Sequence, residues 1–435
     1  MAVTRPAPAW RRPDRTFPAL APFALALWLC ASAAQAAPAL TLAEAERIAV
    51  ERDAVLRQLA SESLAMRERG VAEGQLMDPK LRVGAVNLPV DSFSLDAEDM
   101  TMLEVGVSQE FPAGRTRELA RQRMEQSASA AEAAADDRRL LVRREVRRAW
   151  TELAYVTRAR ELVTDQSQWV EQMRAAARAR YASGEGRQLE VLQAGLDVAM
   201  LREQLLDLDR DEAMRRAQLG RWIGEEEARR AAATSLPARA PLEPLAALQE
   251  RLMQHPAQVD FERRIDAAQT AVDLARQRNR PGWMLDVSYG FRSGEGMDGE
   301  SRPDMLSAMV SVDLPLFRGN RQDREVAAAR AEARGLHEMH DDHRREMGAM
   351  LAEAWSVAAR TAELEQFYET ELLPLAGQSV QAALLAYRAN RSMIDEVIAA
   401  RRAALETSLK HLRLSADRAQ AWYDVEYLTG GPGNE

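Results

Sequence analysis

An internal duplication restricts this 435-residue chain to folds that are built from two equivalent units. The two halves match at an offset of about 202 to 207 residues, and the matches keep one order along the whole length. The matched pairs are Pro79 with Pro281, Trp150 with Trp355, Tyr181 with Tyr387, Glu190 with Glu396, and Gly224 with Gly430. A constant order of matches is typical of a duplicated unit, so we expect both halves to fold alike.

Each unit should contain one very long helix. Residues 115–180 contain neither proline nor glycine and consist largely of strong helix formers. A single helix of this length would extend about 100 Å at 1.5 Å per residue, and no compact domain uses such a rod. Because glycine (22), proline (18) and aromatic residues (5 %) are also scarce, we expect a mainly α chain with a small β part.

Two strand-like segments precede the long helix in each unit. In the first unit Leu103, Val105 and Val107 alternate with other side chains, as in a strand with one apolar face. Turn-forming residues lie on both sides of these segments. We therefore expect β-hairpins at 81–110 and 283–314, which gives four strands per chain.

These patterns predict a leader, two repeats and a linker. The first repeat, residues 37–230, should consist of an opening helix over about 41–77, a hairpin at 81–110, a long helix at 115–180 and a return helix at 187–222. A linker at 231–244 with three prolines follows. The second repeat, residues 245–430, should consist of an opening helix, a hairpin at 283–314, a long helix at 321–388 and a return helix at 392–428. Pro374 should kink or break the second long helix about one turn upstream.

The first 36 residues have the pattern of a cleaved secretory signal. Arginines precede an apolar run at 19–29, and Ala34-Gln35-Ala36 offers small residues at the two positions that a signal peptidase reads. The single cysteine, Cys30, follows Leu29 rather than a small residue, so we expect no lipid anchor. The alternative is an uncleaved membrane anchor, which would need about 20 apolar residues.

Neither catalysis nor nucleic-acid binding is expected. A formal net charge of −9 disfavours contacts with phosphates, which need a basic surface. The sequence has no Gly-x-x-x-x-Gly-Lys loop and no group of nucleophile, base and orienting partner at a meaningful spacing. We therefore expect no enzyme and no cofactor.

Four strands and long rods together indicate an assembly. The strands are near the nine to eleven residues that cross a membrane, yet four strands cannot close a barrel, and open edges cannot lie in lipid. Three copies would supply twelve strands, within the known range of outer-membrane barrels. The alternative is a soluble four-stranded sheet packed on helices.

Several motifs resemble the TolC-type outer-membrane efflux protein family over essentially the whole mature chain. They are Leu42-x-x-Ala45, the strand end Gln109-Glu110-Phe111-Pro112, its counterpart Leu314-Pro315-Leu316-Phe317, and the turns Tyr181-x-x-Gly184 and Tyr387-x-x-Asn390. The resemblance implies a homotrimer with a 12-stranded outer-membrane β-barrel in lipid and a periplasmic α-helical tunnel. It also implies two partners, a periplasmic adaptor (membrane fusion) protein and an inner-membrane RND-type pump.

The same resemblance assigns a role to the two turns between long and return helices. They would form the periplasmic entrance and dock the adaptor. The residues that fall there are Gly184, Arg187, Gln188, Leu189 and Glu190 in the first repeat, and Asn390, Arg391, Met393, Ile394, Asp395 and Glu396 in the second. Three copies of Glu190 and Glu396 would make an acidic gate ring that favours cations. The alternative is that both are solvated acids near helix ends.

Two further features bear on metals. His337, His340 and His343 are spaced three apart on the second long helix, so neighbouring pairs could hold a soft cation, although a metal-free surface cluster is the simpler interpretation. Methionines in or beside the strands carry thioethers, which are soft ligands for Cu(I) but also ordinary apolar filler. These methionines are Met77, Met100, Met102, Met284, Met297, Met305 and Met309.

The function that these features favour is a passive exit duct of a tripartite efflux system. The stretch from Asn87 to Phe93 resembles the branch that serves heavy-metal exporters, so metal cations are favoured as cargo. Drug efflux and type I protein secretion are alternatives. A periplasmic coiled-coil scaffold without a pore is the alternative from another class, and two matched hairpins argue against it.

Overall fold

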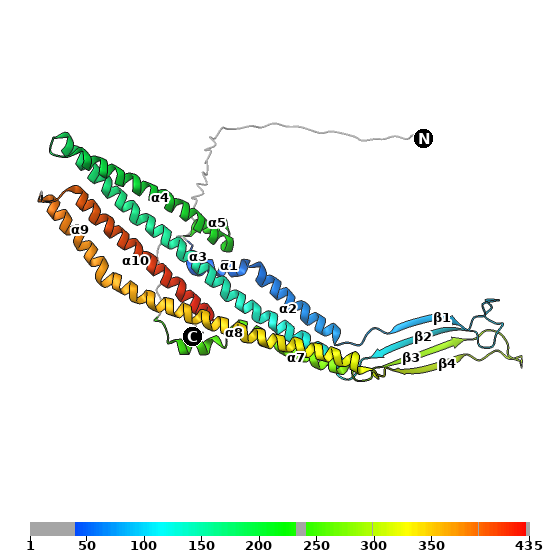
Figure 1. Ribbon diagram of the computed structural model, residues 1–435. Helices are drawn as coiled ribbons and strands as arrows, with labels where there is room; N and C mark the ends of the chain where they lie inside the picture. Colours follow the sequence, from blue (N-terminus) through cyan, green and yellow to red (C-terminus); the bar gives the residue numbers. More distant parts are fainter. Residues whose placement is uncertain (1–39, 232–240, 298, 390, 432–435) are drawn as a thin grey trace, which may run out of the picture. The chain divides into compact units, whose positions relative to one another are not determined.

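A computed structural model describes residues 40–231, 241–297, 299–389 and 391–431, which belong to one compact unit (Figure 1). The predicted signal at 1–36, most of the linker at 231–244, and Asn390 lie outside the described residues.

The first repeat contains five helices and two strands. Their bounds are α1 Leu42–Arg52, α2 Ala54–Glu73, β1 Lys80–Val86, β2 Met102–Phe111, α3 Thr116–Ala182, α4 Gln188–Ile223 and α5 Glu225–Arg230. The helix α3 has 67 residues without interruption, where the sequence predicts one helix over 115–180.

The second repeat follows the same order. Its elements are α6 Leu245–Leu252, α7 Pro256–Gln277, β3 Trp283–Phe291, β4 Met305–Val312, a 3₁₀ turn at Arg318–Asn320, α8 Gln322–Phe367, a π-helix at Tyr368–Leu372, α9 Leu373–Arg388 and α10 Ile394–Leu428. The predicted fold class, mainly α with duplicated helical hairpins and four strands, is confirmed.

The opening helical stretch predicted over about 41–77 consists of two helices in the structure, α1 and α2. Asp53 has an extended backbone, with φ −64° and ψ 119°, and separates α1 from α2. Its carboxylate accepts the Leu56 N–H at 2.8 Å, which is the contact of an N-cap, and it also pairs with Arg138 of α3 at 2.8 Å. The chain therefore breaks where a capping residue finds a cation on the neighbouring helix.

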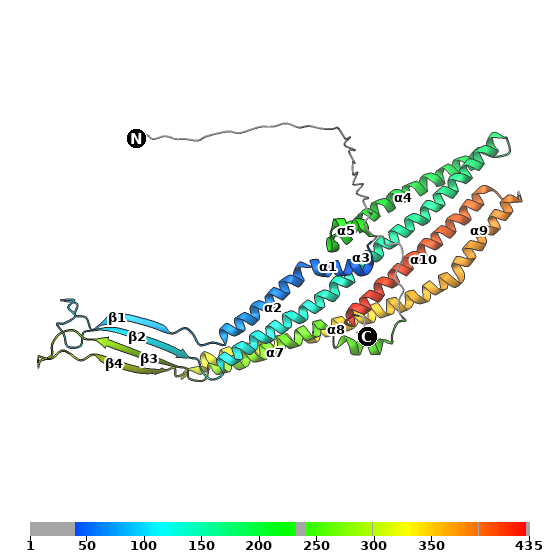
Figure 2. The same ribbon diagram turned by 180° about the vertical axis from the view of Figure 1, so that it is seen from behind.

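The helices of each repeat pack on its long helix. The helices α1, α2 and α4 contact α3, while α6, α7 and α10 contact α8. Contacts of α3 with α7 and α10 join the two repeats, as Figures 1 and 2 show. None of the helices within the described ranges is long and apolar enough to cross a membrane.

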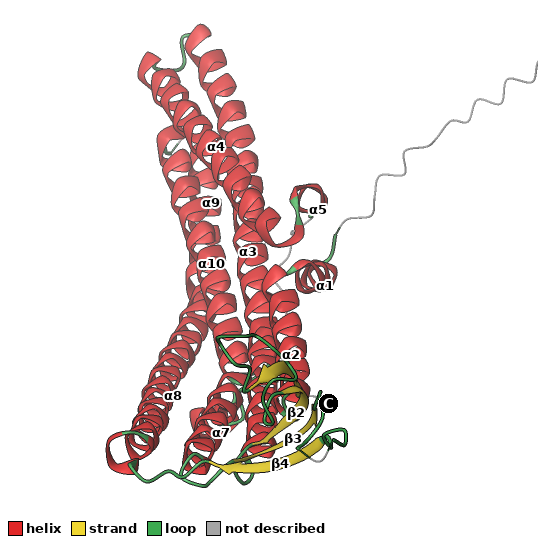
Figure 3. Ribbon diagram, turned by 90° about the vertical axis from the view of Figure 1, so that its right-hand side faces the viewer, coloured by secondary structure: helices red, strands yellow, loops and turns green. Residues whose placement is uncertain are grey.

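The four strands form one antiparallel sheet in the order β1-β2-β3-β4. In the registers, Val83 faces Val105, Val105 faces Tyr289, and Tyr289 faces Leu306. Each strand follows or precedes a helix end, so the sheet continues from the ends of α2, α3, α7 and α8 (Figure 1). Figure 3 shows the strands, in yellow, at that end of the helices. Within the described chain β1 pairs only with β2 and β4 only with β3, which leaves both outer edges without a strand partner.

Candidate functional site

The first turn, between α3 and α4, depends on two glycines. Gly184 has a φ of +82°, which residues with a Cβ rarely adopt. A Cβ on Gly186 would lie 2.9 Å from the Tyr181 backbone nitrogen, so that position excludes a side chain. The N–H of Gly186 donates to the Arg180 carbonyl at 2.9 Å and closes the end of α3. Of the residues predicted to dock the adaptor, Arg187, Gln188 and Leu189 are exposed in this turn.

The second turn, between α9 and α10, closes in a similar way. The N–H of Arg391 donates to the Ala386 carbonyl at 2.9 Å. Ile394 begins α10 and is buried, with 1 % of its surface exposed. The exposed residues of this turn are Arg391, Met393, Asp395 and Glu396.

The structure brings the two turns together. A cluster of buried residues from α3, α4 and α10 lies beneath them, namely Ala177, Ala194, Ile394 and Ile398. Above the cluster, the Arg180 guanidinium donates to the Tyr387 hydroxyl at 3.3 Å and lies over its ring. Farther along, Asp197 of α4 pairs with Arg402 of α10 beside a groove of about 310 Å³. The turns are therefore held as one surface.

The two repeat-matched acids differ in their surroundings. Glu190 is buried, with 9 % exposure, whereas Glu396 is exposed. The hydrogen bond that Arg180 donates to Tyr387, together with the nearby carboxylates of Glu190 and Glu185, raises the pKa of Arg180. Glu190 is thus buried near a cation of its own chain, while Glu396 is exposed to solvent.

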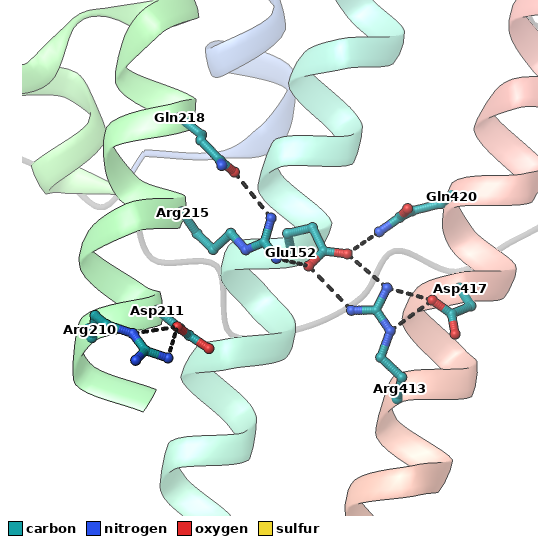
Figure 4. Close-up of polar contacts among 8 residues, drawn as sticks. All are labelled: Glu152, Arg210, Asp211, Arg215, Gln218, Arg413, Asp417 and Gln420. Atoms are coloured by element: carbon teal, nitrogen blue, oxygen red, sulfur yellow. Dashed lines mark hydrogen bonds and ion pairs between the residues drawn. The ribbon is translucent and has the colours of Figure 1, made fainter. Parts of the chain in front are cut away.

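A second polar network lies midway along the helices (Figure 4). Glu152 of α3 accepts a hydrogen bond from Arg413 of α10 at 2.9 Å and forms an ion pair with Arg215 of α4 at 3.3 Å. Arg413 also pairs with Asp417, and Gln420 donates to Glu152. Burial alone would raise the pKa of Glu152, but the hydrogen bond and charge of Arg413 outweigh burial and lower it. This network ties the return helices of both repeats to α3.

The three predicted histidines have different environments. His337 is exposed. His340 and His343 flank the ring of Phe261, with centroid distances of 5.6 and 5.0 Å, and the Nε2 of His340 lies 2.8 Å from the Gln258 amide oxygen. Two of the three rings therefore pack against α7.

Sequence reasoning missed a different group of possible ligands. Among the described residues, the potential metal-binding atoms of Glu365, Glu369 and His411 lie within 4.8 Å of one another. Glu365 already accepts from Ser415 and from Arg418, the latter at 2.6 Å. Glu365 and Glu369 are four residues apart on adjoining helical segments, whereas His411 comes from α10, so no spacing in the sequence joins the histidine to the two acids.

The register sorts the sheet into one apolar and one polar face, since residues that face each other across strands point to the same side. The apolar face consists of Leu81, Val83, Ala85, Leu103, Val105, Val107, Phe111, Trp283, Leu285, Val287, Tyr289, Phe291, Leu306, Ala308, Val310 and Val312, with Gln109 near its helix end. Val83 is 70 % exposed and Leu306 is 74 % exposed. This face therefore lacks a partner within the described part of the chain.

The polar face accounts for Arg82, a charged residue that interrupts the apolar alternation of the first strand in the sequence. Arg82 lies on this face, where its guanidinium pairs with Glu104 at 2.8 Å and with Asp286 at 2.9 Å. The three charges come from three adjacent strands. Sequence alone could not pair them, because the register between the repeats decides which side chains meet.

Comparisons with known proteins agree with this architecture. The family model described as outer membrane efflux protein matches residues 35–225, so the predicted family resemblance is confirmed over the first repeat. A comparison with curated proteins gives no match.

Solved structures with the same fold include outer-membrane channels. The outer-membrane channel OprN has a TM-score of 0.73 at 16 % identity, and 90 % of each chain is covered. The outer membrane protein VceC of Vibrio cholerae has a TM-score of 0.73 at 18 % identity, with 90 % of this chain and 96 % of that chain covered. CusC, described as forming a transmembrane channel, has a TM-score of 0.72 at 15 % identity, with 90 % and 92 % covered. These similarities establish the fold.

Proposed function

We propose that this chain, whose first repeat carries the outer membrane efflux protein match, is the outer-membrane duct of a tripartite efflux system. The duct would be a passive homotrimer in the outer membrane that extends into the periplasm. Its energy would come from an inner-membrane RND-type pump through a periplasmic adaptor protein.

The two-faced sheet carries this proposal. An apolar face with exposed Val83 and Leu306 would be favourable in lipid and unfavourable in water. Within the described chain the outer edges of β1 and β4 are unpaired, and in lipid they would need partners because each unpaired backbone group costs several kcal/mol there. Three sheets joined edge to edge would give a closed barrel whose polar faces, with Arg82 and Glu104, line the lumen.

The joined turns are the surface proposed to dock the adaptor. They present exposed apolar and charged side chains next to each other, and Leu189 and Met393 are 58 % and 41 % exposed. Arg187 and Arg391 lie beside them. A rigid base beneath the turns, made by the Ile394 cluster, would let an adaptor bind without ordering the turns first.

The acids at the turns favour cations as cargo, with heavy-metal cations preferred to drugs or secreted proteins. Because Glu396 is exposed and Glu190 is buried near Arg180, we expect Glu396 to contribute more to a gate ring.

Conductance across a planar lipid bilayer tests the proposal. Discrete cation-selective steps are expected from the purified mature protein. Glu396→Gln should lower the cation-to-anion permeability ratio at least about twofold, Glu190→Gln should lower it less, and the double variant should lower it most. Glu406→Gln, an exposed acid farther along α10, is the matched control and should leave the ratio unchanged.

Two outcomes would contradict parts of the proposal. A folded protein that stays soluble without detergent and never conducts would exclude the duct and favour the periplasmic scaffold. Normal conductance with the same selectivity in all acid variants would retain the duct and reject the gate ring.

A further inference from the structure

The methionines of the sheet all lie on its polar face. Register places Met305 opposite Gly290, Met309 opposite Asp286, and Met284 opposite Ser311. Met102 is two residues from Glu104 on the same strand and therefore shares its face. The apolar face contains Leu, Val, Ala and aromatic residues but no methionine within the described strands.

This distribution is the opposite of what apolar filling predicts. Methionine as a gap filler belongs among apolar side chains, and the lipid-facing side would accept it readily. On the polar face the thioethers instead lie among serine, glycine and charged residues, and Met309 is 64 % exposed. Their shared property in that setting is a soft sulfur that water can reach.

The first methionine pair lies on either side of a glycine. The sulfur of Met102 rests over Gly290, where a Cβ would collide with it. Met305 approaches the same Gly290 from β4. The missing side chain makes room for the Met102 thioether over Gly290, next to Met305, so both sulfurs can turn toward one ion.

The second pair includes a carboxylate. Met309 faces Asp286 directly, and Met284 is two residues along β3 on the same face. Side chains in such opposite and diagonal positions lie within reach of one another. Asp286 is held by Arg82 at 2.9 Å, which leaves the two thioethers as the mobile donors.

We infer that the polar face of the sheet binds soft monovalent cations, Cu(I) or Ag(I), through its four methionines while they pass through the duct. This inference rests on the proposed function and narrows its cargo. Thioethers select soft metals over Zn²⁺ and Mg²⁺. Transport also needs binding that is weak enough for release, and pairs of neutral thioethers meet that need better than thiolates. Only one cysteine exists in the chain, Cys30, and it lies in the predicted signal.

Silver in a nitrate electrolyte is the probe, because chloride would precipitate it. Micromolar AgNO₃ should reduce the single-channel potassium conductance of the wild-type protein. The variant with Met102, Met284, Met305 and Met309 changed to Leu should conduct potassium normally and need about tenfold or more silver for the same block. In the matched control, the exposed helix residues Met200, Met214, Met339 and Met350 are changed to Leu, and the silver block should persist.

Other outcomes separate this inference from the duct itself. Equal silver block in wild type and the strand variant, with conductance intact, would overturn the soft-cation site and leave the duct. A block by tetraphenylphosphonium that depends on these methionines, without silver dependence, would assign them to apolar cargo and also overturn it.

A binding measurement decides the inference even if no pore forms. Calorimetric titration of the detergent-solubilised, folded protein with AgNO₃ should give sites that the strand variant loses and the helix variant keeps. Zn(NO₃)₂ should give no heat that depends on the strand methionines. Silver binding that is the same in both variants would reject the site independently of conductance.

Discussion

At the scale of single residues, opposite charges on neighbouring helices join the two repeats. Arg147 of α3 reaches Glu46 of α1 at 2.6 Å and Glu426 of α10 at 2.5 Å. Glu152 likewise connects three helices. These groups are half-buried or more, so losing one partner leaves a charge that water reaches poorly.

Glu152→Gln should therefore lower the free energy of unfolding by about 2 kcal/mol at pH 7, the value of a hydrogen-bonded charge pair. The folded-state pKa of Glu152 lies below its ordinary value of 4.5. Its contribution is then complete above that ordinary value and disappears as the pH falls through the depressed pKa. Denaturant unfolding of the wild type and the variant between pH 7 and pH 3 measures the difference.

Glu161→Gln is the control on the same helix. Glu161 pairs with Arg158 one turn away, and both side chains are about half exposed, at 47 % and 54 %. Exposed pairs of this kind contribute about 0.5 kcal/mol or less. A loss at Glu161 equal to that at Glu152, or a Glu152 effect that grows toward pH 3, would contradict the network argument.

Residue roles were only partly predictable from the sequence. The pairing of Tyr181 with Tyr387 located both turns, because equivalent residues recur in equivalent repeats. The difference between Glu190 and Glu396 was not predictable, since it depends on Arg180 and on burial that only the packed helices create. The proximity of His411 to Glu365 and Glu369 was not predictable either, because it depends on how α10 packs.

At the scale of elements, the clearest asymmetry between the repeats is the π-helix at Tyr368–Leu372. Pro374 lacks the N–H that would bond one turn back, and the π-helix lies where the sequence predicts a kink or local break. Tyr387 also lies one residue farther from Trp355 than Tyr181 lies from Trp150. A π turn accommodates one extra residue, so the second repeat differs from the first by a single insertion.

Deleting Thr370 in a Pro374→Ala background should convert α8, the π-helix and α9 into one continuous α-helix. The deletion removes the extra residue, so Val380 and Tyr387 keep their faces toward α10 and α3. Pro374→Ala alone should keep the π turn, because straightening without the deletion would rotate α9 by about 100° and expose Val380. Amide hydrogen exchange of the segment 364–380 in each of the two variants measures whether the π turn is kept or lost.

The expected results differ sharply between the two variants. Exchange of the segment should slow strongly in the double change and little in the single change. Slow exchange in Pro374→Ala alone would show that proline, not the insertion, maintains the π turn. Deletion of Ala362, in α8 ahead of the π segment, is the control and should destabilise the packing with α10 instead of straightening the helix.

Strands and long helices were predictable because each has a strong local period. The helix breaks at Asp53 and His255 were not, since capping residues are also tolerated inside helices. His255 accepts the Ala257 N–H at 3.2 Å ahead of Pro256, and this cap repeats the break of the first unit. The apolar and polar faces of the sheet could not be assigned from the sequence, because the assignment depends on the register between β2 and β3, which no local pattern encodes.

At the scale of the whole molecule, the proposed duct needs more than one copy of the duplicated chain. The helices bury their contacts within the chain, while the sheet exposes its apolar face and both edges. The two edge strands are suited to pair between copies. All neighbouring strands of the sheet are antiparallel, so β4 of one copy and β1 of the next would also run antiparallel.

Cysteine pairs at the edges should therefore join copies into closed rings of three. We expect Gly84→Cys on β1, combined in turn with Ser307→Cys, Met309→Cys or Ser311→Cys on β4, to include one pair in register, because all four positions lie on the polar face. A disulfide needs Cβ atoms about 3.8 Å apart, so a productive pair also reports the register between chains. The background is clean, since Cys30 belongs to the predicted signal.

Non-reducing gel electrophoresis after mild oxidation measures how many chains the disulfides link. A pair in register should show dimers and trimers and nothing larger, while each single-cysteine variant should show no trimer, because one thiol can link only two chains. Gly106→Cys with Ser307→Cys should likewise give no trimer, because β2 is an inner strand that a second copy cannot reach. A ladder that continues beyond the trimer would mean that the edges pair without closing, and monomers for every pair would mean that the edges do not meet at all.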